Sequence, residues 1–191
     1  MGYFPEIIKD GNLELRRLET NFDNARMVFD GIEKERIKLV SLWMFKNLDT
    51  IETTYEWMKP FNEDLGMDSP LRHGRLMGIF ADGKYTGFIG IVSIDESVKK
   101  IGLIYYLSKK FEGRGYVSRA IKMIEQEFFG KLSWNKIEIG FMETNDKSQA
   151  IAERNGYVIE GMRREVNFID GKFMGQVTAG KLKTEWEKEN A

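Results

Sequence analysis

The sequence predicts a single α/β (α+β) domain built on a mixed sheet in which several neighbouring strands are antiparallel. Three observations lead to this fold class. The chain has 191 residues, enough for one well-buried core and short of two ordinary domains. The spacing of apolar residues along the chain predicts strands and helices in the order β-α-α-β-β-β-α-β-α-β-β. This order is not that of a doubly wound Rossmann array. No repeat, low-complexity tract or Pro/Gly/Ser linker divides the chain.

The first half of the chain carries a strand, two helices and a hairpin. Asp82-Gly83 separates two short apolar stretches and is typical of a hairpin turn. The predicted elements are a strand at residues 13–17, a helix that Thr20 or Asn21 can cap and that extends to Ile32, a helix at 50–61, and strands at 76–81 and 85–94.

The second half contains the clearest helix of the sequence, at residues 116–129. Five apolar side chains form one stripe along it: Val117, Ala120, Ile121, Ile124 and Phe128. Gly130 stands where a C-terminal cap is expected. The other predicted elements are strands at 101–108 and 136–141, a short helix at 148–154 that Asn155-Gly156 ends, and a closing hairpin around Asp170-Gly171.

Composition narrows the classes of function. A net charge of -1, from 29 basic and 30 acidic residues, argues against nucleic acid or an anionic membrane as the main partner. The absence of cysteine removes disulfides, thiolate nucleophiles and cysteine-ligated zinc, and a single histidine excludes a histidine-rich metal site. The first residues do not form a signal peptide, and no apolar run spans a bilayer. We therefore expect a cytoplasmic protein that uses no metal.

A glycine-containing loop joins the strand at 101–108 to the helix at 116–129. Its sequence is Glu112-Gly113-Arg114-Gly115-Tyr116-Val117-Ser118. Two glycines let the backbone approach a ligand, and the first turn of a helix has N–H groups without intrahelical partners. A phosphate would be stabilised there by the helix dipole, with Arg114 and Ser118 adding a charge and a hydroxyl. The same two glycines are also consistent with an ordinary tight turn, because the segment lacks the remaining residues of a dinucleotide or Walker fingerprint.

Further motifs follow this loop in a recognisable order. Asn145-Asp146-Lys147-Ser148 precedes the short helix, Asn155-Gly156-Tyr157 ends it, and Glu160-Gly161 and Arg163 precede the closing hairpin. Together these segments resemble the GNAT superfamily of N-acetyltransferases, in particular its RimJ/RimL branch, and are similar to bacterial ribosomal-protein serine acetyltransferases. Two positions depart from the family pattern: Glu112 replaces Gln or Arg, and Val117 replaces a small residue. Neither change removes a backbone N–H, although the Glu112 carboxylate must point away from an anion.

The resemblance implies the GNAT acyl-CoA N-acyltransferase fold. That fold has about seven strands, helices on both faces of the sheet, and a splay between the fourth and fifth strands. It also implies acetyl-CoA as co-substrate, with its pyrophosphate on the segment from Glu112 to Ser118. Tyr106, Leu107 and Ser108 would then line the pantetheine arm, and Asn145 would hydrogen-bond it from the other side. Relatives are often dimers, so the resemblance also allows a homodimer.

Two side chains are candidates for catalysis, the first of them by the same resemblance. Ser148 would act near the sulfur, because the tyrosine that many superfamily members place seven residues after the motif asparagine is Ala152 here. Glu160 would receive the amine proton. Each has a structural alternative: Ser148 as the cap of the helix that follows it, and Glu160 as an exposed strand carboxylate. His73 could be a base, although its place in a loop just before a strand favours a surface histidine instead.

Three functions remain open from the sequence. The first is acetylation of a protein N-terminal α-amine, of the ribosomal-protein type. This acceptor is favoured because an α-amine, with a pKa of about 7.7 to 8.0, is partly neutral near pH 7, whereas a lysine at about 10.4 is not. The second is acetylation of a small-molecule amine on the same fold. The third is an acyl-CoA-binding module without turnover.

Overall fold

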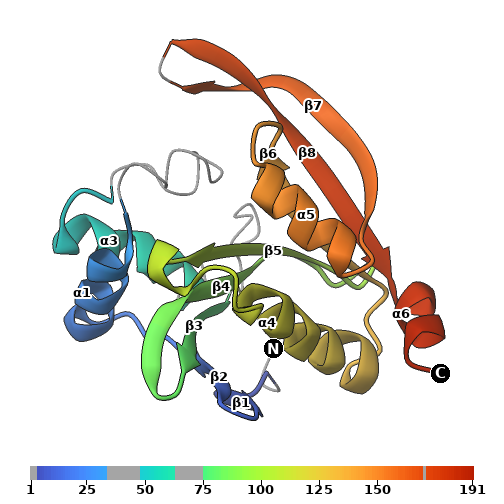
Figure 1. The fold of residues 1–191 in the computed structure, drawn as a ribbon, viewed down its shortest axis with the longest axis horizontal. Helices are drawn as coiled ribbons and strands as arrows, with labels where there is room; N and C mark the ends of the chain where they lie inside the picture. Colours follow the sequence, from blue (N-terminus) through green and yellow to red (C-terminus); the bar gives the residue numbers. More distant parts are fainter. Residues whose placement is uncertain (1–3, 34–47, 63–74, 170) are drawn as a thin grey trace.

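Eight strands form one mixed sheet in the computed structural model, which describes residues 4–33, 48–62, 75–169 and 171–191 (Figure 1). The strand order is β1-β2-β3-β4-β5-β6-β8-β7, and only the β5–β6 pair is parallel. The mixed sheet is therefore confirmed, with one more strand, β1, than predicted. The strands are β1 Ile7–Asp10, β2 Leu13–Arg17, β3 Arg75–Ala81, β4 Lys84–Asp95, β5 Lys100–Leu107, β6 Lys136–Met142, β7 Val158–Ile169 and β8 Lys172–Leu182.

The helices begin where the sequence provides caps. Side chains of Asn21 and Thr50 cap α1 (Phe22–Gly31) and α3 (Ile51–Met58). The remaining helical elements are η1 Lys59–Phe61, η2 Lys109–Phe111, α4 Tyr116–Glu125, η3 Gln126–Lys131, α5 Asp146–Arg154 and α6 Lys183–Glu189. None of the helices in the described ranges is both long and apolar enough to span a membrane.

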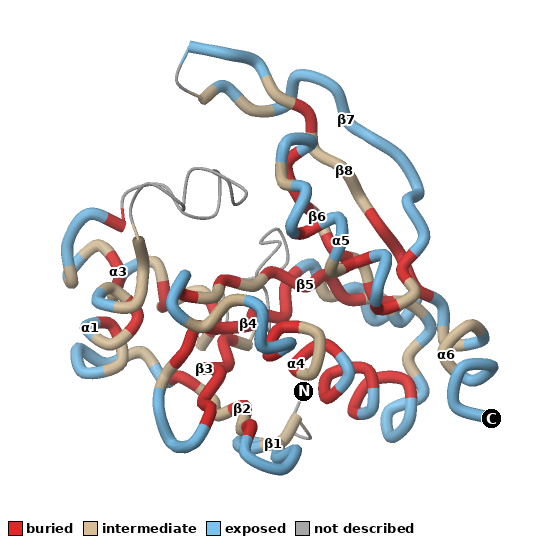
Figure 2. The backbone as a smooth tube through the Cα atoms, in the orientation of Figure 1, coloured by how far each residue is buried: buried red, intermediate tan, exposed pale blue. Residues whose placement is uncertain are grey.

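Two apolar clusters cover opposite faces of the sheet, so helices on both faces are confirmed. The helix α4 packs against one face (Figure 2). All five residues of the predicted stripe are buried, four of them on α4 and Phe128 on η3. The other face packs against α1 and α3, where Val28, Met58 and Phe61 are fully buried. Strand alternation decides the destination of each β5 side chain: Leu103 faces the α4 cluster, whereas Ile104 and Tyr106 face α1.

The prediction that Gly130 ends the long helix is wrong. The chain continues from α4 through a π-helical turn, η3, to Lys131. Trp186 of α6, a helix that the sequence did not predict, packs against Phe129 with ring centroids 5.9 Å apart. A Cβ on Gly130 would lie 3.3 Å from that indole. The Gln126 side chain, in the same helical segment, lies closer still, at 2.7 Å from such a Cβ, so Gly130 is enclosed by Gln126 and Trp186 and does not end the helix.

Candidate functional site

The loop between β5 and α4 has the backbone of an anion site. Gly113 and Gly115 have φ angles of 75° and 73°, a region that favours glycine. Among the described residues, no atom beyond the adjacent ones lies within 4 Å of a Cβ built on either. Gly115 is the N-cap of α4 and provides no side-chain cap, whereas Asn21, Thr50 and Asn145 cap α1, α3 and α5. The first N–H groups of α4 are therefore left for a ligand.

The charges around the loop favour an anion. The Glu112 carboxylate contacts the ammonium of Lys147, on α5, at 2.8 Å. This ion pair gives the carboxylate a partner on α5, as the departure from the family pattern requires. The Arg114 guanidinium is exposed and lies 5.8 Å from the centroid of the Phe111 ring. A positive side chain thus stands at the loop beside the helix terminus.

The predicted splay follows directly beside this loop. β5 and β6 pair from Lys100–Lys136 to Leu103–Ile139. Beyond that point β5 continues along β4, and β6 continues along β8, so the two strands diverge (Figure 1). In sequence order with β1 included they are the fifth and sixth strands rather than the fourth and fifth.

The three residues predicted to line the pantetheine arm have side chains on different sides of the sheet. The Tyr106 hydroxyl donates to the Glu33 carboxylate and accepts from the Glu33 N–H at 2.8 Å. The Ser108 hydroxyl donates to the Gly31 carbonyl. Both side chains are thus tied to the end of α1, while Leu107 packs with the α4 cluster. Tyr106 and Ser108 would therefore contact a pantetheine arm through their backbone atoms.

Tyr105, which the sequence analysis did not select, lies on the α4 side of β5 next to α5. Its hydroxyl donates a long hydrogen bond, 3.5 Å, to the Ser148 carbonyl. Burial raises the pKa of Tyr105 to about 12, so the phenol is protonated at neutral pH. Strand alternation could have found it, because Tyr105 and Tyr106 must face opposite sides of the sheet.

Asn145 and Ser148 lie at the start of α5, where β6 has already left β5. The Asn145 side chain is the cap of this helix, accepting from the Ser148 N–H at 3.1 Å. The alternative in which Ser148 caps the helix is therefore wrong. Ser148 is 8% exposed, and its hydroxyl makes no hydrogen bond within the described ranges. Ala152, at the position of the missing tyrosine, is fully buried in the core.

Glu160 lies apart from these residues. Its carboxylate contacts the Lys136 ammonium at 2.7 Å, and Lys136 also contacts Glu138 at 3.0 Å. The carboxylate reaches Lys136 across β8 because Gly180 has no side chain: a Cβ there would lie 2.6 Å from it. Lys136 lies where β5 and β6 are still paired, away from the point at which the two strands diverge. The structure therefore does not bring Glu160 to Ser148. His73 lies outside the described residues.

A hollow of about 510 Å³ between β1 and α4 contains none of the predicted site residues. Its lining includes Ile8, Asp10 and Arg119. Arg119 is held there by an ion pair with Asp10 at 2.8 Å. The loop and the strand divergence, and not this hollow, carry the features of a site.

A glycine loop, a helix without a side-chain cap and two diverging parallel strands thus lie together in this structure. The model of the family described as acetyltransferase (GNAT) domain matches residues 12–158. The chain belongs to the GNAT family of acetyltransferases.

Relatives within the family differ in the acceptors that their names give. The chain is 28% identical over 154 residues to the "Putative ribosomal N-acetyltransferase YdaF" of Bacillus subtilis (strain 168), covering 77% of this chain and 80% of that protein. It is 24% identical over 96 residues to spermidine N(1)-acetyltransferase of Escherichia coli (strain K12), covering 50% and 52%. Among solved structures, the RimL ribosomal L7/L12 alpha-N-protein acetyltransferase in complex with coenzyme A matches with a TM-score of 0.79 at 18% identity, covering 93% of this chain and 98% of that one.

Proposed function

We propose that this acetyltransferase moves an acetyl group from acetyl-CoA directly to a primary amine, and that its acceptor is a protein N-terminal α-amine of the ribosomal-protein type. The observation that carries the use of acetyl-CoA is the loop at Gly113 and Gly115, which heads an uncapped helix beside two diverging strands. The acceptor class rests on the relative YdaF, whose match covers more of both chains than the spermidine enzyme's match.

The residues at the loop fit the pyrophosphate of coenzyme A. Backbone N–H groups from Gly113 to Ser118 would hold its oxygens, because α4 begins without a side-chain cap and the described residues leave open space beside both glycines. Arg114 would add a positive charge, and Lys147 neutralises Glu112, the one carboxylate in the loop. The pantetheine arm would lie along the backbone of Tyr106 to Ser108, with Asn145 on the opposite side.

Acetyl-CoA would supply the activated acetyl group, so the chain needs only to orient an amine and help a thiolate leave. An α-amine with a pKa of about 7.7 to 8.0 is partly neutral without a strong base. Two hydroxyls stand where the strands diverge, those of Ser148 and Tyr105. The C–N bond forms as the C–S bond breaks, and the proton that the amine gives up balances the one that the thiolate takes. We assign the relay of this proton to Ser148, which would give its hydroxyl proton to the sulfur and recover one from the amine nitrogen, with Tyr105 as a second protonated hydroxyl close by. Glu160 is already paired with Lys136, which leaves it poorly placed to take the amine proton.

A small polyamine is the second candidate acceptor, favoured by the match to the spermidine enzyme. The two candidates separate in one assay. Thiol release from acetyl-CoA is measured with peptides that differ at residue 1, and in parallel with spermidine and spermine. Turnover with peptides that are free at the N-terminus, and its loss when that amine is blocked, supports the α-amine.

Turnover with polyamines and with none of the peptides would contradict the α-amine acceptor and support the polyamine. Coenzyme A binding without transfer to any amine would instead indicate the non-catalytic module. No coenzyme A binding at all would remove the proposed co-substrate. The homodimer and the cytoplasmic location remain predictions, which light scattering and cell fractionation can test.

A further inference from the structure

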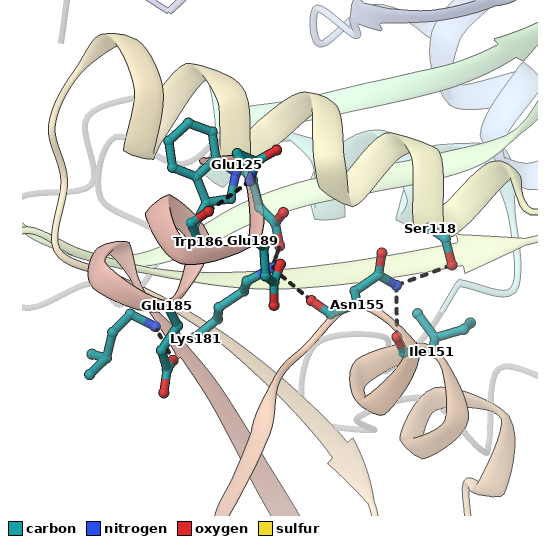
Figure 3. A network of polar contacts seen from close by, with 10 residues as sticks. Ser118, Glu125, Ile151, Asn155, Lys181, Glu185, Trp186 and Glu189 are labelled. Carbon is teal, nitrogen blue, oxygen red and sulfur yellow. Dashed lines mark hydrogen bonds and ion pairs between the residues drawn. The ribbon is translucent and has the colours of Figure 1, made fainter.

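A buried amide lies directly behind the first turn of α4. Asn155, at the end of α5, is 3% exposed. Its Nδ2 donates to the Ser118 hydroxyl oxygen at 3.1 Å and to the Ile151 carbonyl oxygen at 2.7 Å (Figure 3). Ser118 is the third residue of α4, in the turn whose N–H groups form the predicted phosphate site. The amide therefore connects the two helices at the loop.

The direction of the Asn155 amide is fixed by Ile151. A backbone carbonyl can only accept, so the group that faces it at 2.7 Å must be the NH2 of the amide. The opposite orientation would place two acceptor oxygens in contact. The Asn155 Oδ1 is buried without a hydrogen-bond partner in the described structure, which is the cost of satisfying Ile151.

This direction determines what the Ser118 hydroxyl can do. One hydrogen of the amide goes to Ile151, and the other goes to the Ser118 oxygen. Ser118 is therefore an acceptor towards Asn155, and its own proton is not used in that bond. Within the described ranges this hydroxyl donates to no protein acceptor, and the side chain is only partly buried. The proton is left for a ligand.

Asn155 is held in place from the opposite side as well. Its backbone carbonyl accepts from the ammonium of Lys181 at 2.8 Å. Lys181 is 1% exposed and also contacts Glu189 of α6 at 2.5 Å and Glu125 of α4 at 3.5 Å (Figure 3). The Asn155 backbone is thus tied through Lys181 to β8, α4 and α6, while the side-chain amide is held by Ser118 and Ile151.

We propose that Asn155 is a positioning residue of the cofactor loop: by donating to the Ser118 oxygen, it directs the Ser118 hydroxyl proton to the pyrophosphate of coenzyme A. The inference rests on the proposed use of acetyl-CoA. It assigns a role to an asparagine that does not touch the cofactor, and it makes the polar cluster behind α4 part of the binding site. The bond to a charged oxygen is stronger than a neutral one, so its loss is measurable.

The test measures the affinity of the full chain for coenzyme A and for pantetheine, which lacks the pyrophosphate, by titration calorimetry. The variants are Ser118→Ala, Asn155→Ala and the double variant. Asn62→Ala is the matched control, because Asn62 Nδ2 also donates to one backbone carbonyl, that of Leu18, and to one hydroxyl, that of Thr20.

Ser118→Ala should weaken coenzyme A binding about tenfold, and Asn155→Ala should act in the same direction. The double variant should bind within about twofold of Ser118→Ala, because both substitutions remove the same contact. Pantetheine binding, and coenzyme A binding by the control, should change less than about twofold.

The proposal is overturned if Asn155→Ala keeps wild-type affinity, or if the two losses multiply in the double variant. If Asn155→Ala does not fold, Ser118→Ala still tests the proposal. Unchanged affinity for coenzyme A in that variant would mean that the Ser118 hydroxyl does not contact the pyrophosphate. Failure of the wild type itself to bind coenzyme A would overturn the proposed co-substrate instead, and this outcome is distinct from the others.

Discussion

Replacing Gly115 with alanine tests whether the shape of the loop holds the cofactor. Gly115 has a φ angle of 73°, and an added Cβ would meet no atom within 4 Å in the described part of the chain beyond the adjacent residues, so the substitution introduces no clash there. The substitution is nevertheless unfavourable, because a residue with a side chain in the left-handed backbone conformation costs roughly 1–2 kcal/mol of stability. The chain can relieve that strain only by turning the N-cap of α4, which moves the N–H groups of the first turn away from the ligand.

Loss of one hydrogen bond to a charged oxygen corresponds to about 1.5–3 kcal/mol, which is about tenfold or more in affinity. We therefore expect Gly115→Ala to weaken coenzyme A binding at least about tenfold in titration calorimetry. Gly83→Ala is the matched control, because Gly83 has a φ of 74° and equally open space in the turn between β3 and β4. It should lose similar stability and keep its affinity. Equal affinities in both variants and the wild type would refute the role assigned to the backbone.

Three further substitutions test catalysis, electrostatics and packing. Ser148→Ala should lower kcat about tenfold to a hundredfold with little change in the KM for acetyl-CoA, and an unchanged kcat would exclude the hydroxyl from proton transfer. Burial raises the pKa of Glu125 from 4.5 to about 7, although the nearby Lys181 lowers it. The folded state therefore holds this proton more tightly than the unfolded state, so the free energy of unfolding should fall by about 2–3 kcal/mol as pH rises from 4.5 through 7. Glu125→Gln should remove that part of the pH dependence in urea denaturation, and an identical slope would contradict the assignment. Phe128→Ala should cost about 3–5 kcal/mol, because the ring is 1% exposed and packs against Phe4 and Trp134; a loss below about 1 kcal/mol would contradict this packing.

Local features of the site could be predicted from the sequence because they depend on short-range physics. Gly113 and Gly115 both adopt positive φ angles, as the strand-to-helix loop requires. The stripe of α4 is buried in full because helical spacing fixes which side chains share a face. The motif around Asn145 also lies at the divergence of β5 and β6, as the resemblance implies.

Features that depend on distant parts of the chain could not be predicted in the same way. Glu160 forms an ion pair with Lys136 and does not reach the site. This ion pair requires a glycine, Gly180, on the strand that lies between the two residues. Gly130 lies inside a helical segment, and one of the side chains beside it, Trp186, comes more than fifty residues later in the chain. Such contacts follow from strand order and helix docking, which local periodicity does not contain.

Tyr105 is an intermediate case. Alternation along β5 places Tyr105 and Tyr106 on opposite faces, and this much follows from the sequence. Which of the two faces α5 depends on the position of α4 and α5 over the sheet. The resemblance pointed to Tyr106, but the hydroxyl of Tyr106 is bound to Glu33 just beyond the end of α1.

The central claim is that coenzyme A binds with its pyrophosphate on the loop that begins α4. An NMR titration of the isotope-labelled chain with coenzyme A tests it most directly, by following backbone amide resonances along the sequence. The account predicts the largest shifts for the amides from Gly113 to Ser118, with smaller changes at Asn145. Saturable binding that leaves the Gly113 to Ser118 resonances in place would contradict it.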